Sequence, residues 1–114
     1  MAPSGPALRG VDEIVAQEHD GRTRLVVRGD LDLATRDDFI RELARALERG
    51  RVEIDLRELE YIDSVGLSTL IEADRMATAA PNGERVRILV APEGAVRRMV
   101  ELTLLHLTLD VRHG

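Results

Sequence analysis

The sequence contains no cysteine, no tryptophan and no lysine, and its only aromatic residues are Phe39 and Tyr61. The absence of cysteine excludes disulfide bonds and thiolate metal sites. Two aromatic residues cannot form a stacking platform for single-stranded nucleic acid, and the arginines are scattered among carboxylates instead of forming a basic stripe. We therefore do not predict nucleic acid as a direct partner.

Long apolar runs are also missing. No segment approaches the roughly 20 apolar residues that cross a bilayer, and the first ten residues lack the apolar centre of a secretory signal. These absences predict a cytoplasmic protein with no membrane insertion. With 114 residues and a net charge of −5, the chain fits one domain. Pro3, Gly5 and Pro6 predict a flexible N-terminal tail over residues 1–10, followed by a single domain over residues 11–114.

Residues suited to catalysis are few. The imidazoles are limited to His19, His106 and His113, and the chain has neither a Gly-x-Ser-x-Gly elbow nor a phosphate-binding loop. Asp30, Asp32 and Asp63 could hold a metal ion only if their loops converged, and no histidine supports such a site. We predict a protein that is not an enzyme and uses no cofactor or metal.

The periodicity of apolar residues predicts an α/β domain in the order ββαβαβαβ. Asp20-Gly21 indicates a hairpin turn. Apolar residues at helical spacing predict a helix that Thr35 caps and Gly50 ends. Pro81-Asn82-Gly83 ends the next helix. Alternation of strands and helices after the hairpin predicts a mixed sheet covered by helices. The predicted elements are strands over Ile14–Glu18 and Thr23–Arg28, a helix after Thr35, a strand over Val52–Leu56, a helix from Ser64, a strand over Val86–Val90, a helix over Pro92–Leu102 and a strand over Leu107–Val111.

The segment Asp63-Ser64-Val65-Gly66-Leu67 carries most of the functional information. It joins a strand to a helix and places Ser64 where a helix cap is expected, so that a phosphate on its hydroxyl would face the helix dipole and the amides of Gly66 and Leu67. Ser and Asp are preferred at helix caps with or without a further role. The position alone therefore does not indicate a function.

Two separated motifs are similar to those of STAS domains, the family of anti-sigma factor antagonists and of cytoplasmic domains of sulphate transporters. The first is the segment from Val52 to Leu67, and the second is the turn Gly29-Asp30-Leu31-Asp32-Leu33-Ala34-Thr35 before the first helix. The resemblance covers roughly nine tenths of the chain, and both motifs occur in the family's order. It implies the STAS fold.

The resemblance also implies a function. In an anti-sigma factor antagonist the unphosphorylated protein binds an anti-sigma factor that is also a serine kinase, and a serine phosphatase reverses its phosphorylation. Ser64 matches the phosphoacceptor, and the implied partner-binding residues are Asp30, Asp32, Asp63, Ser64, Val65, Gly66 and Leu67. A regulatory subunit of a membrane lipid or anion transporter and a stressosome-like scaffold remain alternatives, because one fold serves several functions.

One departure from the family pattern affects the third helix. Leu102-Thr103-Leu104-Leu105 stands where relatives have Leu-Thr-Gly-Leu, so the glycine that would end this helix is replaced by Leu104. We expect the helix either to continue or to end with a strained backbone.

Overall fold

The structure is a computed structural model, and it describes residues 14–114. The predicted tail over residues 1–10 and the predicted start of the domain at Val11 lie outside the described residues. The elements are β1 (Ile14–His19), β2 (Arg22–Val27), β3 (Gly29–Leu31), α1 (Leu33–Arg49), β4 (Val52–Asp55), β5 (Leu59–Ile62), α2 (Ser64–Ala79), β6 (Arg87–Val90), α3 (Ala95–Leu102), a 3-10 helix (Leu105–Leu107) and β7 (Asp110–His113).

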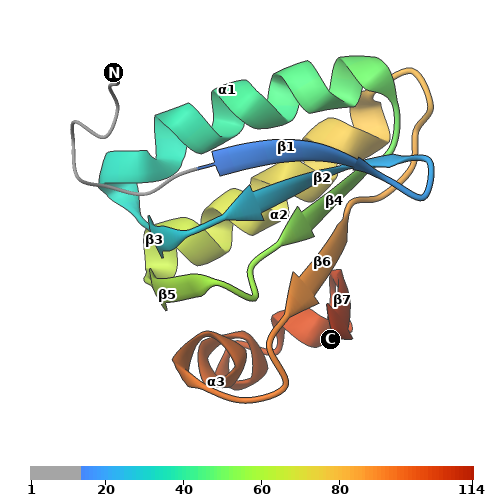
Figure 1. The fold of residues 1–114 in the computed structure, drawn as a ribbon. Coiled ribbons are helices and arrows are strands. Elements are labelled where there is room, and N and C mark those ends of the chain that lie inside the picture. Colours follow the sequence, from blue (N-terminus) through green and yellow to red (C-terminus); the bar gives the residue numbers. More distant parts are fainter. Residues whose placement is uncertain (1–13) are drawn as a thin grey trace.

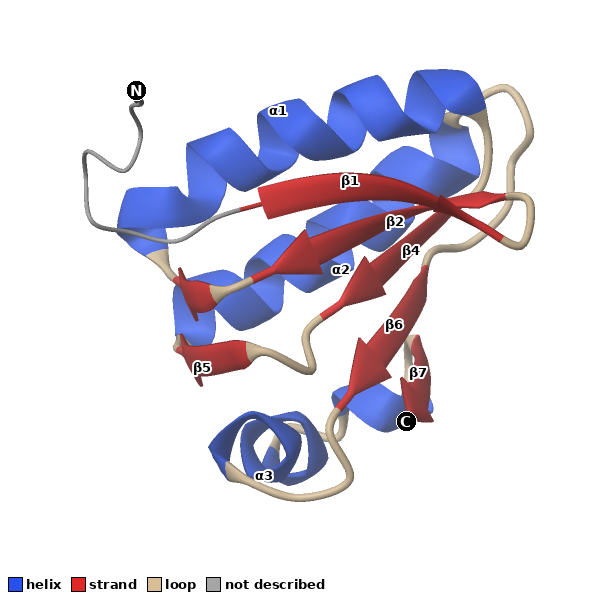
Figure 2. Ribbon diagram, viewed as in Figure 1, coloured by secondary structure: helices blue, strands red, loops and turns tan. Residues whose placement is uncertain are grey.

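The main sheet has five strands in the order β1-β2-β4-β6-β7. Strand β1 is antiparallel to β2, as the Asp20-Gly21 turn predicts, and the other neighbours are parallel. Helices α1 and α2 lie on the same face of this sheet, whereas α3 lies apart from them beside the end of β6 (Figures 1 and 2). The predicted α/β fold class, a mixed sheet with an N-terminal hairpin and covering helices, is confirmed.

A second, two-stranded sheet was not predicted. It pairs β3 with β5 in parallel. Arg28 separates β2 from β3, whose first residue, Gly29, has a positive φ of 81°. A turn closed by the Leu59 N–H and the Leu56 carbonyl, 3.1 Å apart, separates β5 from β4. The small sheet therefore continues the β2–β4 pair after a kink (Figure 1). A strand of three residues is too short to show a period of two, which is why the sequence did not reveal it.

The core lies between the five-stranded sheet and helices α1 and α2. Its largest fully buried side chain is Phe39 of α1, and Leu25, Ile54 and Ile88 of the three central strands are also fully buried. Each such side chain stabilises the fold by about 1.5–3 kcal/mol. The core fixes both helices on the sheet, and it thereby fixes the position of their N-termini.

The opposite face of the central strands carries charged residues. The register places Arg24, Glu53 and Arg87 side by side, and these alternate with the core residues along each strand. Glu53 accepts a hydrogen bond from Arg24 Nε at 2.6 Å, and its second carboxylate oxygen lies 3.7 Å from Arg87 Nη1. The Glu53 side chain is only 4% exposed, so this pairing compensates a buried charge.

Asp55, the next outward residue of β4, is buried as well. Burial by itself would raise the pKa of Asp55, but hydrogen bonds from the Arg57 guanidinium and backbone N–H outweigh it and hold that pKa below its usual value. The alternating strand Val52–Asp55 is therefore buried on both faces. The sequence pattern did not predict this.

The C-terminal region differs from the predicted strand over Leu107–Val111. Residues Leu105–Leu107 form a 3-10 helix, and β7 begins only at Asp110. Leu105 and Leu109 are buried while Leu107 is 73% exposed. Apolar residues four apart thus face the core here, a spacing that fits a helical turn and not a strand.

Helix α3 ends with the strained backbone that the replacement of glycine by Leu104 predicts. The helix stops at Leu102, and Leu104 adopts the left-handed conformation with φ of 60° and ψ of 21°. Its N–H donates to the carbonyl of Glu101 at 3.1 Å. For a residue with a Cβ, this conformation costs about 1–2 kcal/mol relative to the right-handed one.

We expect Leu104→Gly to raise the free energy of unfolding by about 1 kcal/mol, because glycine adopts the left-handed conformation without strain. The Leu104 side chain is 57% exposed, so its removal costs little burial. Leu104→Ala is the matched control, since it removes the same side chain but keeps the Cβ. Thermal unfolding should show a higher midpoint for the glycine variant alone, and an equal rise for alanine would contradict the role of backbone strain.

Candidate functional site

Two helices begin next to each other at one end of the small sheet. Leu31 of β3 pairs with Ile62 of β5, and each is followed by an aspartate that caps a helix. Asp32 caps α1: its carboxylate accepts hydrogen bonds from the N–H groups of Ala34 and Thr35 at 3.0 and 3.2 Å. Thr35, which the sequence predicts as the cap, is instead the second partner of this capping box, and its hydroxyl accepts the Asp32 N–H.

The N-terminus of α2 has the same kind of cap. Asp63 is the capping residue, and its Oδ1 accepts the Gly66 N–H at 2.9 Å. Ser64 is therefore the first residue of the helix and not its cap, contrary to the prediction from the sequence. Because the Asp63 carboxylate accepts this N–H, the Ser64 hydroxyl has no capping role, and Ser64 is exposed.

The amides expected to face a phosphate on Ser64 are already engaged. The Gly66 N–H donates to the Asp63 carboxylate, and the Leu67 N–H donates to the Asp63 carbonyl at 2.9 Å. Gly66 and Leu67 are also buried, whereas their prediction as partner-binding residues remains a prediction. Their role here is to hold the first turn of α2 in place.

Gly66 sets how closely α2 approaches the small sheet. A Cβ built on Gly66 would lie 2.2 Å from the carbonyl oxygen of Leu31 and 2.6 Å from Cγ1 of Ile62. Only glycine allows this approach, because the nearest atom belongs to the backbone of β3. The exposed Ser64 thus lies at a helix end that packs tightly against β3 and β5.

The hydroxyl groups one turn further along α2 have local partners. Ser68 Oγ and Thr69 Oγ1 both donate to the Val65 carbonyl, at 2.9 and 2.7 Å. Thr69 is buried, whereas Ser68 is exposed. Among these three neighbouring hydroxyls, Ser64 combines exposure with a position at the helix end.

A hollow of about 280 Å³ lies beside Ser64. It is lined by Tyr61, Ile62, Asp63, Ser64, Ala95 and Met99. The last two residues belong to α3, about 30 positions further along the chain, and the sequence did not point to them because nothing local marks them as neighbours of Ser64. Tyr61 is 51% exposed, and Leu33, the first residue of α1, is 74% exposed. The hollow beside the serine is therefore lined mainly by apolar side chains, one of which, Tyr61, is exposed.

The remaining predicted site residues lie at the same edge. Asp30 pairs with Tyr61 across the small sheet, and its carbonyl accepts the Thr35 hydroxyl at 3.0 Å. Val65 is half-buried. Within residues 14–114, no group of three or more possible ligands is arranged to hold a metal ion. No helix in that same range is long and apolar enough to cross a membrane.

Comparisons with known proteins agree with this architecture. A family model described as "Mlab, STAS domain" matches residues 14–109. No curated protein sequence matches the chain.

Solved structures of anti-sigma factor antagonists have the same fold. One from Mycobacterium paratuberculosis is 22% identical, with a TM-score of 0.77 over 90% of this chain and 86% of its own. A putative antagonist from Thermotoga maritima is 18% identical, with a TM-score of 0.71 over 89% of this chain and 86% of its own. The antagonist SpoIIAA in its unphosphorylated form is 18% identical, with a TM-score of 0.67 over 90% of this chain and 88% of its own.

Proposed function

This chain belongs to the STAS domain family, and we propose that it acts within that family as an anti-sigma factor antagonist. In this proposal the unphosphorylated protein binds an anti-sigma factor that is also a serine kinase, and a sigma factor is released. Phosphorylation of Ser64 ends the binding, and a serine phosphatase restores it. The fold shared with the solved antagonists is typically non-catalytic, which supports a binding role.

The observation that carries the proposal is the position of Ser64. Its exposed hydroxyl lies at the first residue of α2, on a helix end held by the Asp63 cap and by the close packing of Gly66. A protein kinase contributes the nucleotide, the metal ions and the catalytic base. The substrate then needs only a hydroxyl group in a fixed and accessible place, which is what Ser64 offers. Asp30, Asp32, Asp63 and Val65 are the proposed contacts around it.

Phosphorylation would act on the surface of this site and not on the fold. It adds a charge of about −1.5 to −2 at neutral pH, and the helix dipole stabilises such a charge by about 0.3–1 kcal/mol. The nearby Asp63 carboxylate opposes it and already occupies the Gly66 N–H. These contributions are small beside the burial that holds α2. A charge that must lose its hydration under a bound partner is therefore the proposed cause of release.

We expect a serine kinase of the anti-sigma factor type from the same genome to place one phosphate on Ser64 in the presence of MgATP. Each recombinant kinase of this type would be tested, with intact mass and peptide mapping as the measurements. Ser64→Ala is the control and should remain unmodified. Phosphate on Ser68 or Thr35 with Ser64 unmodified would contradict the assignment. Binding to a transporter ATPase, with no binding to any of these kinases, would contradict it as well.

A further inference from the structure

The hollow beside Ser64 has a size and lining that suit a protein side chain. Its volume of about 280 Å³ is close to the lower limit of roughly 300 Å³ for small-molecule sites, and it leaves room for one aliphatic side chain. Its walls are formed mainly by Tyr61, Ile62, Ala95 and Met99, with Asp63 and Ser64 along one side. An aliphatic side chain would bury apolar surface there without leaving a polar group unpaired.

One wall of the hollow is an exposed aromatic side chain. Tyr61 is 51% exposed, and Leu33, at the start of the neighbouring helix, is 74% exposed. Tyr61 forms a wall of the hollow, and Leu33 begins the helix next to that of Ser64. Tyrosine is enriched among the residues that dominate binding energy, and such residues cluster around desolvated pockets near the centre of an interface.

We propose that the anti-sigma factor inserts one aliphatic side chain into this hollow, between the N-terminus of α2 and helix α3. This inference rests on the proposed function. A kinase that phosphorylates Ser64 must cover the residues next to it, and the hollow shares Ser64 as part of its lining. A phosphate on Ser64 then stands at the edge of an apolar contact, where it must be desolvated before the side chain can enter.

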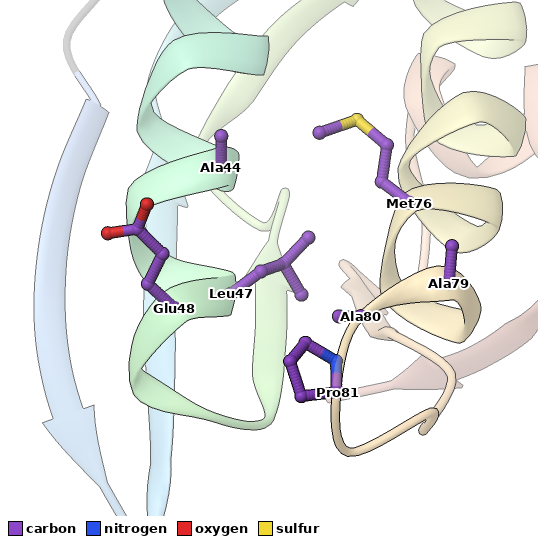
Figure 3. Close-up of a pocket in the computed structure, with 7 residues that line it drawn as sticks. All are labelled: Ala44, Leu47, Glu48, Met76, Ala79, Ala80 and Pro81. Carbon is purple, nitrogen blue, oxygen red and sulfur yellow. The ribbon is translucent and has the colours of Figure 1, made fainter.

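A second hollow on the same molecule provides the control. It has a volume of about 500 Å³ and lies between the C-terminal halves of α1 and α2, where Ala44 and Leu47 face Met76 across the gap (Figure 3). Ala79, which also lines it, is 15 residues along α2 from Ser64, or roughly 22 Å at 1.5 Å per residue. A change in this second hollow leaves the Ser64 edge intact.

The test fills each hollow by the same substitution. Ala95→Leu places a larger side chain in the hollow beside Ser64, and Ala44→Leu does so in the second hollow; both alanines are exposed helix residues. Titration calorimetry would use the recombinant kinase that phosphorylates Ser64. We expect the dissociation constant to rise at least about tenfold for Ala95→Leu and less than about twofold for Ala44→Leu. Tyr61→Ala removes one wall and should weaken binding as well.

The outcomes separate the two proposals. If no kinase of this type binds or phosphorylates the wild-type chain, the proposed function fails. If the wild type binds and both Ala95→Leu and Tyr61→Ala bind equally well, the inference about the hollow fails and the proposed function stands. Equal losses for Ala95→Leu and Ala44→Leu would also overturn the inference. A wild-type dimer that Ala95→Leu converts to a monomer would identify a second copy of the chain as the occupant.

Discussion

Gly66→Ala is expected to lower the free energy of unfolding by about 2–3 kcal/mol, because the new methyl group would overlap the backbone of β3. In an unconstrained helix the same substitution would stabilise by about 1 kcal/mol. Here the built Cβ lies 2.2 Å from the Leu31 carbonyl oxygen, which cannot move aside without shifting the strand. Steric overlap therefore decides the sign of the effect.

Thermal unfolding followed by circular dichroism would measure this loss as a fall of about 10–20 °C in the midpoint. Ser68→Ala is the control, because Ser68 lies two residues further along the same helix and is exposed. Its midpoint should stay close to that of the wild type. A Gly66→Ala protein as stable as Ser68→Ala would show that the contact between α2 and β3 is looser than described.

Glu53→Ala is expected to destabilise the domain by about 3 kcal/mol, because it leaves the arginines on either side of β4, Arg24 and Arg87, without their shared carboxylate. The Glu53 side chain is 4% exposed and that of Arg24 is 16% exposed, with 2.6 Å between Oε1 and Nε. Removal of one member of a buried pair leaves an uncompensated charge in a region of low dielectric. Arg87, which is 28% exposed, moderates the loss because water still reaches it.

Glu58→Ala supplies a matched comparison. Glu58 accepts a hydrogen bond from Arg28 Nε at 2.7 Å, so the chemistry and distance are nearly the same, but the two side chains are 55% and 41% exposed. An exposed pair contributes less than about 1 kcal/mol. Urea unfolding of the two variants should give clearly different midpoints, and equal midpoints would contradict the difference in burial between the two pairs.

The elements that the sequence predicted correctly are those with a local signal. The Asp20-Gly21 turn predicted the hairpin of β1 and β2, and apolar residues at helical spacing predicted α1 and α2. The helix starts were located to within a few residues, but Thr35 and Ser64 were predicted as the caps, whereas Asp32 and Asp63 are the capping residues. In each case an aspartate lies one or three positions before a hydroxyl residue, Ser64 or Thr35, so that two residues are candidates for one cap and only the hydrogen bonds distinguish them.

By itself, the sequence determined the α/β class, the N-terminal hairpin and the position of the main helices, since each depends on neighbours within a few positions, and two motifs similar to those of STAS domains pointed to Ser64. Only the tertiary structure decided that β3 pairs with β5, that Glu53 is buried between two arginines, and that Ala95 and Met99 face Ser64. Each of these depends on residues about 30 positions apart. Such contacts form because the core places the strands and helices side by side, and no local pattern of residues encodes that placement.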